Sequence, residues 1–218
     1  MKHIQPRASR LNPWRMLVTG LALIAGHSAL PACAPLLVGG VMVGSSLMAT
    51  DRRSSGAQVD DQSIELRGAT RVGELATLGN VTLTSYNRIV MITGQVPAQA
   101  DRARVDAAVK QLPNVRSVFN ELAVGANSSI STMSSDSYVS GKVKASFVDA
   151  KDLQVNSLKV VTEQGVVYLM GIVTEREAAR AAEIARSVPG VQKVVRVFEI
   201  ATEAELAGLL AQPAPTKP

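Results

Sequence analysis

The feature of this sequence that most constrains its fold is an internal repeat. Residues 61–125 and 136–200 carry the same order of apolar stripes, alternating runs and turn signals, about 76 positions apart. Outside its leader the chain has about 186 residues, enough for one medium domain or two small ones. Because the signals recur in the same order, the sequence predicts two small domains of one architecture.

Each copy begins with a helical pattern and continues as two strands. Four positions at helical spacing form one apolar stripe, and alternating segments follow on either side of a polar turn. A second helical pattern then leads to a final strand, 115–124 in the first copy and 191–200 in the second. The predicted order is therefore helix, strand, strand, helix, strand. The stripe positions are Ile64, Gly68, Val72 and Leu75 in the first copy and Val139, Val143, Phe147 and Ala150 in the second.

Glycines and helix caps add detail to both copies. Gly94 and Gly171 lie near the end of the second strand, where a glycine marks a bulge or the close approach of another backbone. We interpret both as structural packing points. Thr174 and Glu177 have the spacing of a capping box, which predicts the start of the second helix in the second copy.

These motifs together resemble the BON domain, a small bacterial module of periplasmic and outer-membrane proteins. The resemblance rests on the apolar-x-Gly-x-Val strand ends, Ile92–Val96 and Leu169–Val173, and on the Pro-x-Val turn after each second helix. It implies an α+β fold of two tandem αββαβ BON domains. Each domain would hold a small three-stranded mixed sheet and two helices.

The N-terminus resembles a lipoprotein signal peptide. A basic stretch is followed by the apolar run Met16–Leu30, which is too short to span a bilayer comfortably. Leu30–Cys33 resembles the bacterial lipobox, which implies cleavage of residues 1–32 and a diacylglycerol and an N-acyl chain on Cys33. By resemblance to Gram-negative lipoproteins, Ala34 after the cysteine implies export to the periplasmic face of the outer membrane. The alternatives are an ordinary secretory signal that leaves a free thiol, or a buried structural cysteine.

Loss of the leader also narrows the possible functions. It removes four of the 23 basic residues and none of the 18 acidic ones, so the formal charge falls from +5 to +1. A basic surface for nucleic acid is therefore not supported. Both histidines are removed with the leader, and the resemblance places lipid on the only cysteine, so the mature chain has no imidazole and no free thiol. This argues against triad catalysis, disulfides and His/Cys metal sites. We expect no enzyme, no small-molecule substrate, no catalytic residue and no metal ligand.

The outer faces of the two first helices differ. In the first copy the face opposite the stripe is charged, with Arg67, Arg71 and Glu74. In the second copy that face is weakly polar, with lysines at its margins, as in helices that lie on a membrane surface. The resemblance implies that the second BON domain binds anionic phospholipid there. The expected lipid-binding residues are Tyr138, Lys142, Lys144, Val148 and Lys151.

Alternatives remain open for this face. It could pack against the first copy, or it could dock on an envelope protein such as the β-barrel assembly machinery. A hydrolase with converging carboxylates is a third and distant hypothesis. The resemblance further implies a role in envelope integrity and a position at the division site.

The segments outside the two copies are predicted to be linkers and a C-terminal tail. Residues 33–60 read as a lipidated Gly-rich tether and linker, and residues 126–135 as a linker between the copies. Thr202 and Glu205 predict a cap for a short helix, followed by a Pro-rich disordered tail, within 201–218.

Overall fold

The computed structural model describes residues 51–75 and 79–210, all within one compact unit of the chain. The predicted signal peptide, Cys33 and its tether up to residue 50 lie outside the described residues, as does the predicted tail from residue 211.

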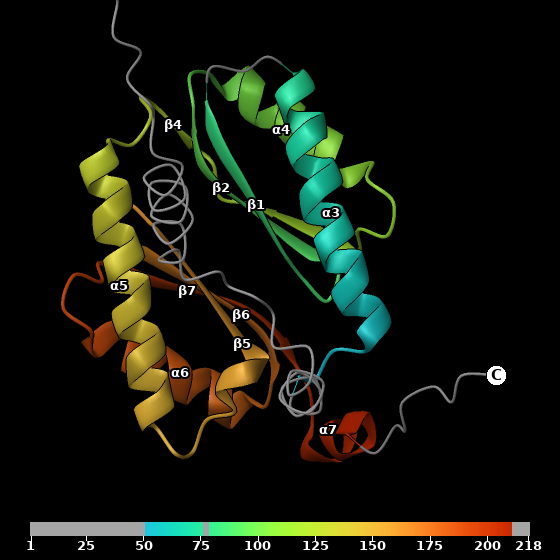
Figure 1. Ribbon diagram of the computed structural model, residues 1–218, viewed down its shortest axis with the longest axis vertical. Coiled ribbons are helices and arrows are strands. Elements are labelled where there is room, and N and C mark those ends of the chain that lie inside the picture. Colours follow the sequence, from blue (N-terminus) through green and yellow to red (C-terminus); the bar gives the residue numbers. More distant parts are fainter. Residues whose placement is uncertain (1–50, 76–78, 211–218) are drawn as a thin grey trace, which may run out of the picture. The chain divides into compact units, whose positions relative to one another are not determined.

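The first copy folds as helix, two strands, helix and a divided last strand (Figure 1). Strand β1 pairs antiparallel with β2, and β2 pairs in parallel with β3 and, further along, with the short β4. The second copy repeats this topology, with β5 antiparallel and β7 parallel to β6. The predicted α+β fold with a mixed sheet in each copy is confirmed. The elements are α3 Ser55–Glu74, β1 Asn80–Tyr86, β2 Ile89–Val96, α4 Gln99–Lys110, β3 Ser117–Asn120 and β4 Ala123–Val124, then α5 Ile130–Asp149, η2 Val155–Ser157, β5 Leu158–Glu163, β6 Val166–Val173, α6 Glu175–Ser187, β7 Lys193–Ile200 and α7 Glu203–Leu210.

Both first helices begin earlier than the sequence predicted. Helix α3 starts at Ser55 because the Ser54 hydroxyl accepts a hydrogen bond from Ala57 N at 3.1 Å. Helix α5 starts at Ile130 because Ser129 caps Thr132 N in the same way, also at 3.1 Å. The predicted linkers 33–60 and 126–135 therefore each contain helix, which corrects those boundaries.

The last strand of the first copy is also interrupted. The sequence predicted one strand over 115–124, but β3 ends at Asn120 and β4 begins at Ala123. Between them the Asn120 side chain accepts a hydrogen bond from Leu122 N at 3.2 Å, and Leu122 is buried in the first core. The break places the Leu122 side chain in the core and interrupts the pairing of the last strand with β2.

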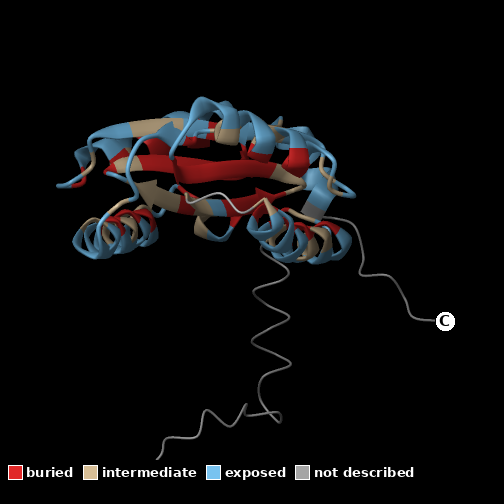
Figure 2. Cartoon of the chain, turned by 90° about the horizontal axis from the view of Figure 1, so that it is seen from above, coloured by how far each residue is buried: buried red, intermediate tan, exposed pale blue. Residues whose placement is uncertain are grey.

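Three apolar clusters hold the described residues together, and the buried residues lie on the strands and on the inward sides of the helices (Figure 2). One cluster lies between helices and sheet in each copy, around Val90 and Ile92 in the first and Val167 and Leu169 in the second. The third joins the opposite faces of the two sheets. Its buried members are Tyr86, Met91, Tyr168, Met170, Ile172, Val197 and Leu206.

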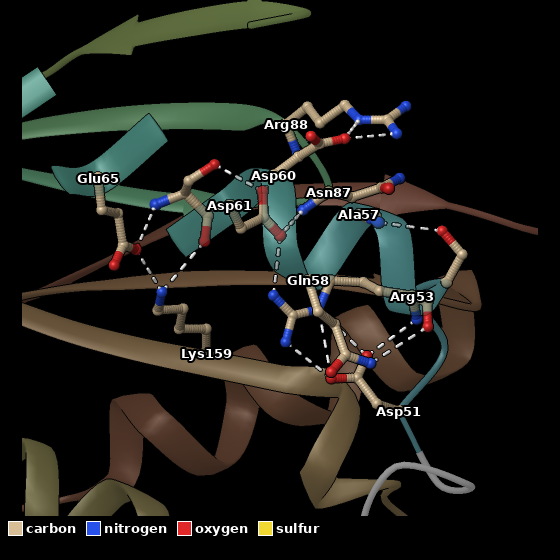
Figure 3. Close-up of polar contacts among 12 residues, drawn as sticks. Asp51, Arg53, Ala57, Gln58, Asp60, Asp61, Glu65, Asn87, Arg88 and Lys159 are labelled. Carbon is tan, nitrogen blue, oxygen red and sulfur yellow. Dashed lines mark hydrogen bonds and ion pairs between the residues drawn. The ribbon is translucent and has the colours of Figure 1, made fainter. Parts of the chain in front are cut away.

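A repeated aspartate ties each first helix to its hairpin turn. Asp61 accepts hydrogen bonds from Asn87 N and Arg88 N at 2.8 and 2.7 Å (Figure 3). Asp136 accepts from Gln164 N and Gly165 N at 2.7 and 2.8 Å. All four turn residues have positive φ, the conformation of the tight hairpin turn that matches strand twist. These bonds fix how α3 and α5 lie on their sheets.

Candidate functional site

The site follows from how α5 is rotated against its sheet. Asp136, Val139, Val143 and Phe147 are its buried residues and recur at helical spacing. Asp136 is held by the turn amides and Phe147 is fully buried in the core of the second copy. The opposite side of the helix is therefore exposed along its whole length.

Two of the predicted lipid-binding residues lie on this exposed side. Tyr138 is 69% exposed and Val148 is 67% exposed, so most of each apolar surface meets solvent. Lys144 is exposed at the margin of the same face. Lys151 is exposed in the turn just beyond the helix, whose C-cap is Ala150. The structure thus brings four of the predicted residues to one surface of the second copy.

Lys142 lies differently. Its ammonium donates a hydrogen bond to Pro189 O, in the loop after α6, and lies 4.8 Å from the centroid of the Tyr138 ring. The side chain is partly buried between these two groups. Lys142 therefore joins α5 to the loop after α6 and contacts the Tyr138 ring, a role that the sequence did not indicate.

The exposed face continues beyond the residues that the sequence predicted. Ile130 is 83% exposed and Met133 is also exposed, in the first turn of α5, where the sequence predicts a linker. Ile130 lies about five helical turns before Val148, on the same side of the helix, and Met133 lies about three turns before Lys144, at the margin of that side. The signal that could have found them is Ser129 as an N-cap, followed by apolar residues at positions 1 and 4 of the helix.

The charges along α5 are favourable to an anionic partner. Between Ile130 and Val148 the only carboxylate is Asp136, which is buried and bonded to backbone amides. Asp149 comes at the helix end, and the other charged residues are Lys142 and Lys144. The exposed face itself is therefore apolar and serine-rich, without an exposed acidic side chain before its last residue.

Helix α3 has a different outer surface. Arg71 and Glu74 form an exposed ion pair at 2.8 Å, in keeping with the predicted charged face. Leu66 is nevertheless 73% exposed, and Val59 is exposed two turns earlier, so the surface is less uniformly charged than predicted. Among the described residues of this helix, several acidic side chains are already bonded to the rest of the protein. They are Asp60, Asp61 and Glu65.

The two glycines singled out in the sequence lie against backbone. A Cβ on Gly94, which has φ +113°, would lie 1.9 Å from Asn80 O. A Cβ on Gly171 would lie 2.3 Å from Ser157 O. Both are places where the neighbouring strand or turn leaves room for hydrogen only.

Within the part of the chain that the structure describes, no group of three acidic, histidine or cysteine side chains is arranged to hold a metal ion. No described helix has the length and apolar character needed to cross a membrane.

Comparison with known proteins adds family information. The model of the BON domain matches residues 65–126 and 135–202. Outer membrane lipoprotein DolP of Haemophilus influenzae is 36% identical over 184 residues, which covers 82% of this chain and 94% of that protein. The 21 kDa hemolysin of Actinobacillus pleuropneumoniae is 31% identical over 151 residues, covering 68% of this chain and 78% of that protein.

A solved structure of CdsD, a structural protein of the type III secretion system of Chlamydia trachomatis, matches with a TM-score of 0.26. It is 12% identical and covers 68% of this chain and 99% of that one. A similarity this low carries no conclusion about this chain.

Proposed function

This chain belongs to the BON-domain family of non-enzymatic, DolP-like lipoproteins, and from that premise we propose that its helix α5 binds anionic phospholipid at a membrane surface. We further propose that the protein is anchored through Cys33 at the periplasmic face of the outer membrane. Cys33 lies outside the described residues, so the anchor rests on the sequence and on the similarity to an outer membrane lipoprotein. The contact would support envelope integrity.

The observation that carries the proposal is the exposed face of α5. Tyr138 and Val148 present apolar surface on a helix whose opposite side is buried in the second core. Lys144 and Lys151 border that surface with ammonium groups. Apolar atoms at the headgroup boundary, with lysines directed to anionic lipid, are the arrangement of an interfacial helix.

The expected affinity is weak. Each lysine near an anionic surface contributes about 1 kcal/mol, and full burial of one exposed side chain such as Val148 contributes about 1.5–3 kcal/mol. A few such contributions give reversible contact rather than stable insertion. A covalent anchor would raise the local concentration of lipid around α5, and a weak patch would then be sufficient.

Vesicle binding tests the proposal. The mature chain with Cys33 replaced by Ser is mixed with phosphatidylcholine vesicles, with or without phosphatidylglycerol, and the bound fraction is measured by flotation. We expect binding only to vesicles that contain phosphatidylglycerol. Lys144→Glu with Lys151→Glu should lower that binding roughly tenfold or more, since two attractive charges become repulsive.

The matched control is Arg67→Glu with Arg71→Glu, which makes the same change of net charge on exposed residues of α3. This control should retain most of the binding. Equal loss in both variants would mean that only net charge matters, and it would remove α5 from the proposal. Equal binding to neutral and anionic vesicles, or none to either, would favour the protein-docking alternative.

A further inference from the structure

Arg52 lies just before the first helix of the first BON domain, yet its side chain is buried in the second. Its guanidinium makes two hydrogen bonds to the Glu177 carboxylate, at 2.7 and 2.9 Å, and one to Ile172 O at 2.9 Å. The two side chains are 8% and 7% exposed. Glu177 is at the same time the third residue of the capping box of α6, where it accepts from Thr174 N at 2.9 Å.

The next residue reaches the first BON domain. Arg53 donates to Asp61 Oδ2 at 2.8 Å, and its guanidinium carbon lies 4.3 Å from the centroid of the Tyr86 ring. Asp51 accepts further hydrogen bonds from Arg53 (Figure 3). Two neighbouring arginines therefore hold two different domains.

A buried ion pair of this kind is costly for a protein to maintain. Removing an arginine and a carboxylate from water costs several kcal/mol for each ion, and their attraction compensates only when the geometry is good. Glu177 does not need Arg52 to cap α6, because a capping box works at exposed helix ends, as Thr202 and Glu205 show at α7. The position of the pair, across 125 residues of sequence, points to a role in joining the domains.

The surroundings agree with that role. Tyr86, under Arg53, and Ile172, whose carbonyl binds Arg52, belong to the same apolar cluster between the two sheets. Leu206 of α7 is buried in that cluster as well. The beginning and the end of the described chain thus meet where the first domain contacts the second.

We infer that residues 51–54, the entry strap, join the two BON domains mechanically, with Arg52 as the residue that fastens the strap to the second domain. The strap makes the folding of one domain depend on the other. It also places the start of the folded region, which follows the predicted tether, against the domain that carries α5. This inference stands whether or not α5 binds lipid.

The test measures whether a weakening of one domain is transmitted to the other. Val105 is fully buried in the first core, so Val105→Ala destabilises the first domain. Hydrogen exchange is measured on β6 of the second domain in the full mature lipoprotein, extracted in detergent. With the strap intact, we expect Val105→Ala to speed the exchange of β6 about tenfold or more.

The same Val105→Ala change is then made in a chain with a broken strap. Arg52→Met with Glu177→Gln removes both charges together, so no ion stays buried without a partner, and glutamine keeps the capping box. In this chain the exchange of β6 should rise less than about threefold. Arg67→Met, which removes an exposed arginine of α3, should leave the transmission unchanged.

Each result is decisive. If Arg52 had only a local role, breaking the strap would change the exchange rates around α6. The factor by which Val105→Ala speeds the exchange of β6 would then be the same with the strap intact and with the strap broken. If the tenfold ratio persists in the broken-strap chain, the strap does not couple the domains. If Val105→Ala has no effect on β6 in the intact chain, the domains unfold independently and the inference is overturned.

Discussion

Asp61 and Asp136 occupy equivalent positions in the repeat and make the same kind of hydrogen bonds in the two domains. Each places two carboxylate oxygens on the two amides of a hairpin turn, so one side chain joins a helix to a turn. Asp61 also accepts from the Ser85 hydroxyl and from Arg53. The shared bonds explain why the first helices lie alike on their sheets although their outer faces differ.

Removal of one of these carboxylates should weaken its domain. Asp136→Ala leaves the amides of Gln164 and Gly165 without their acceptor. An unsatisfied buried donor such as Gly165 N costs about 1–3 kcal/mol, and the partly buried Gln164 N adds to that cost. We expect the free energy of unfolding to fall by about 2–4 kcal/mol, measured by urea denaturation. Asp149→Ala, on the exposed end of the same helix, should change it by less than about 0.5 kcal/mol. A similar loss in both variants would contradict the role given to Asp136.

The close approach at Gly94 gives a second prediction for single residues. An alanine there would bring Cβ to 1.9 Å from Asn80 O and would also strain the positive φ. Gly94→Ala should therefore destabilise the protein by more than about 2 kcal/mol. Gly141→Ala is the control, because its Cβ meets no atom within 4 Å and alanine favours helix by up to about 1 kcal/mol. Thermal unfolding of both variants should show opposite shifts, and equal shifts would refute this assignment.

At the scale of elements, the hydrophobic pattern predicted the order and type of the repeated helices and strands. The stripe from Ile64 to Val72 is on the buried side of α3, and Thr174 starts α6 as the capping box indicated. The pattern failed at the first turns of α3 and α5. Serine caps start both helices there. In α5 no residue before Asp136 is buried, and in α3 the first buried residues are the small Ala57 and the polar Asp61, so neither start has an apolar stripe that the sequence could show.

The sequence predicted some residues of the candidate surface correctly and missed the contacts of others. Exposure of Tyr138 and Val148 could be inferred because they lie opposite a clear apolar stripe. The position of Lys142 could not, because its partner Pro189 is 47 residues away and comes near only in the fold. Charge and spacing alone do not distinguish a lysine that faces lipid from one that binds a carbonyl.

This difference between the lysines of α5 can be measured. Lys142→Gln loses the bond to Pro189 O and the contact with the Tyr138 ring, so it should lower the stability by about 1 kcal/mol. Lys144 lies two residues further along α5 and is exposed, so Lys144→Gln should leave the stability almost unchanged. Urea denaturation compares them directly. Equal stability of the two variants would mean that Lys142 has no structural role and is an ordinary surface lysine.

At the scale of the whole described chain, polar contacts surround the apolar cluster between the sheets. Lys159 binds Glu65 at 2.7 Å, Gln95 binds Glu163 at 2.6 Å, and Arg116 lies 3.2 Å from Glu199. None of these pairs has a signal in the sequence, because each joins residues from different domains. The sequence could predict two domains, but not how side chains far apart in the chain would join them.

The buried pair of Arg52 and Glu177 makes this joint sensitive to acid. Burial alone would raise the pKa of Glu177, but the hydrogen bonds from Arg52 and Thr174 outweigh it and hold the pKa below its usual value of 4.5. A carboxyl with a lower pKa in the folded state adds stability that is fully present above the unfolded pKa. That stability is lost as the pH falls through the lower pKa of the folded protein.

We therefore expect the unfolding temperature of the native chain to fall as the pH drops below about 4.5 and through the lower pKa that Glu177 has in the folded protein. Arg52→Met with Glu177→Gln has no carboxyl to protonate at this position, so its unfolding temperature should fall less over the same range. Calorimetry on both chains at matched ionic strength gives the slope of the unfolding temperature against pH for each chain. Other carboxylates contribute equally to both chains, and only the difference between the slopes belongs to Glu177. Parallel curves would mean that Glu177 has the same pKa in the folded and unfolded protein, and that the buried pair does not link the stability of the joint to pH.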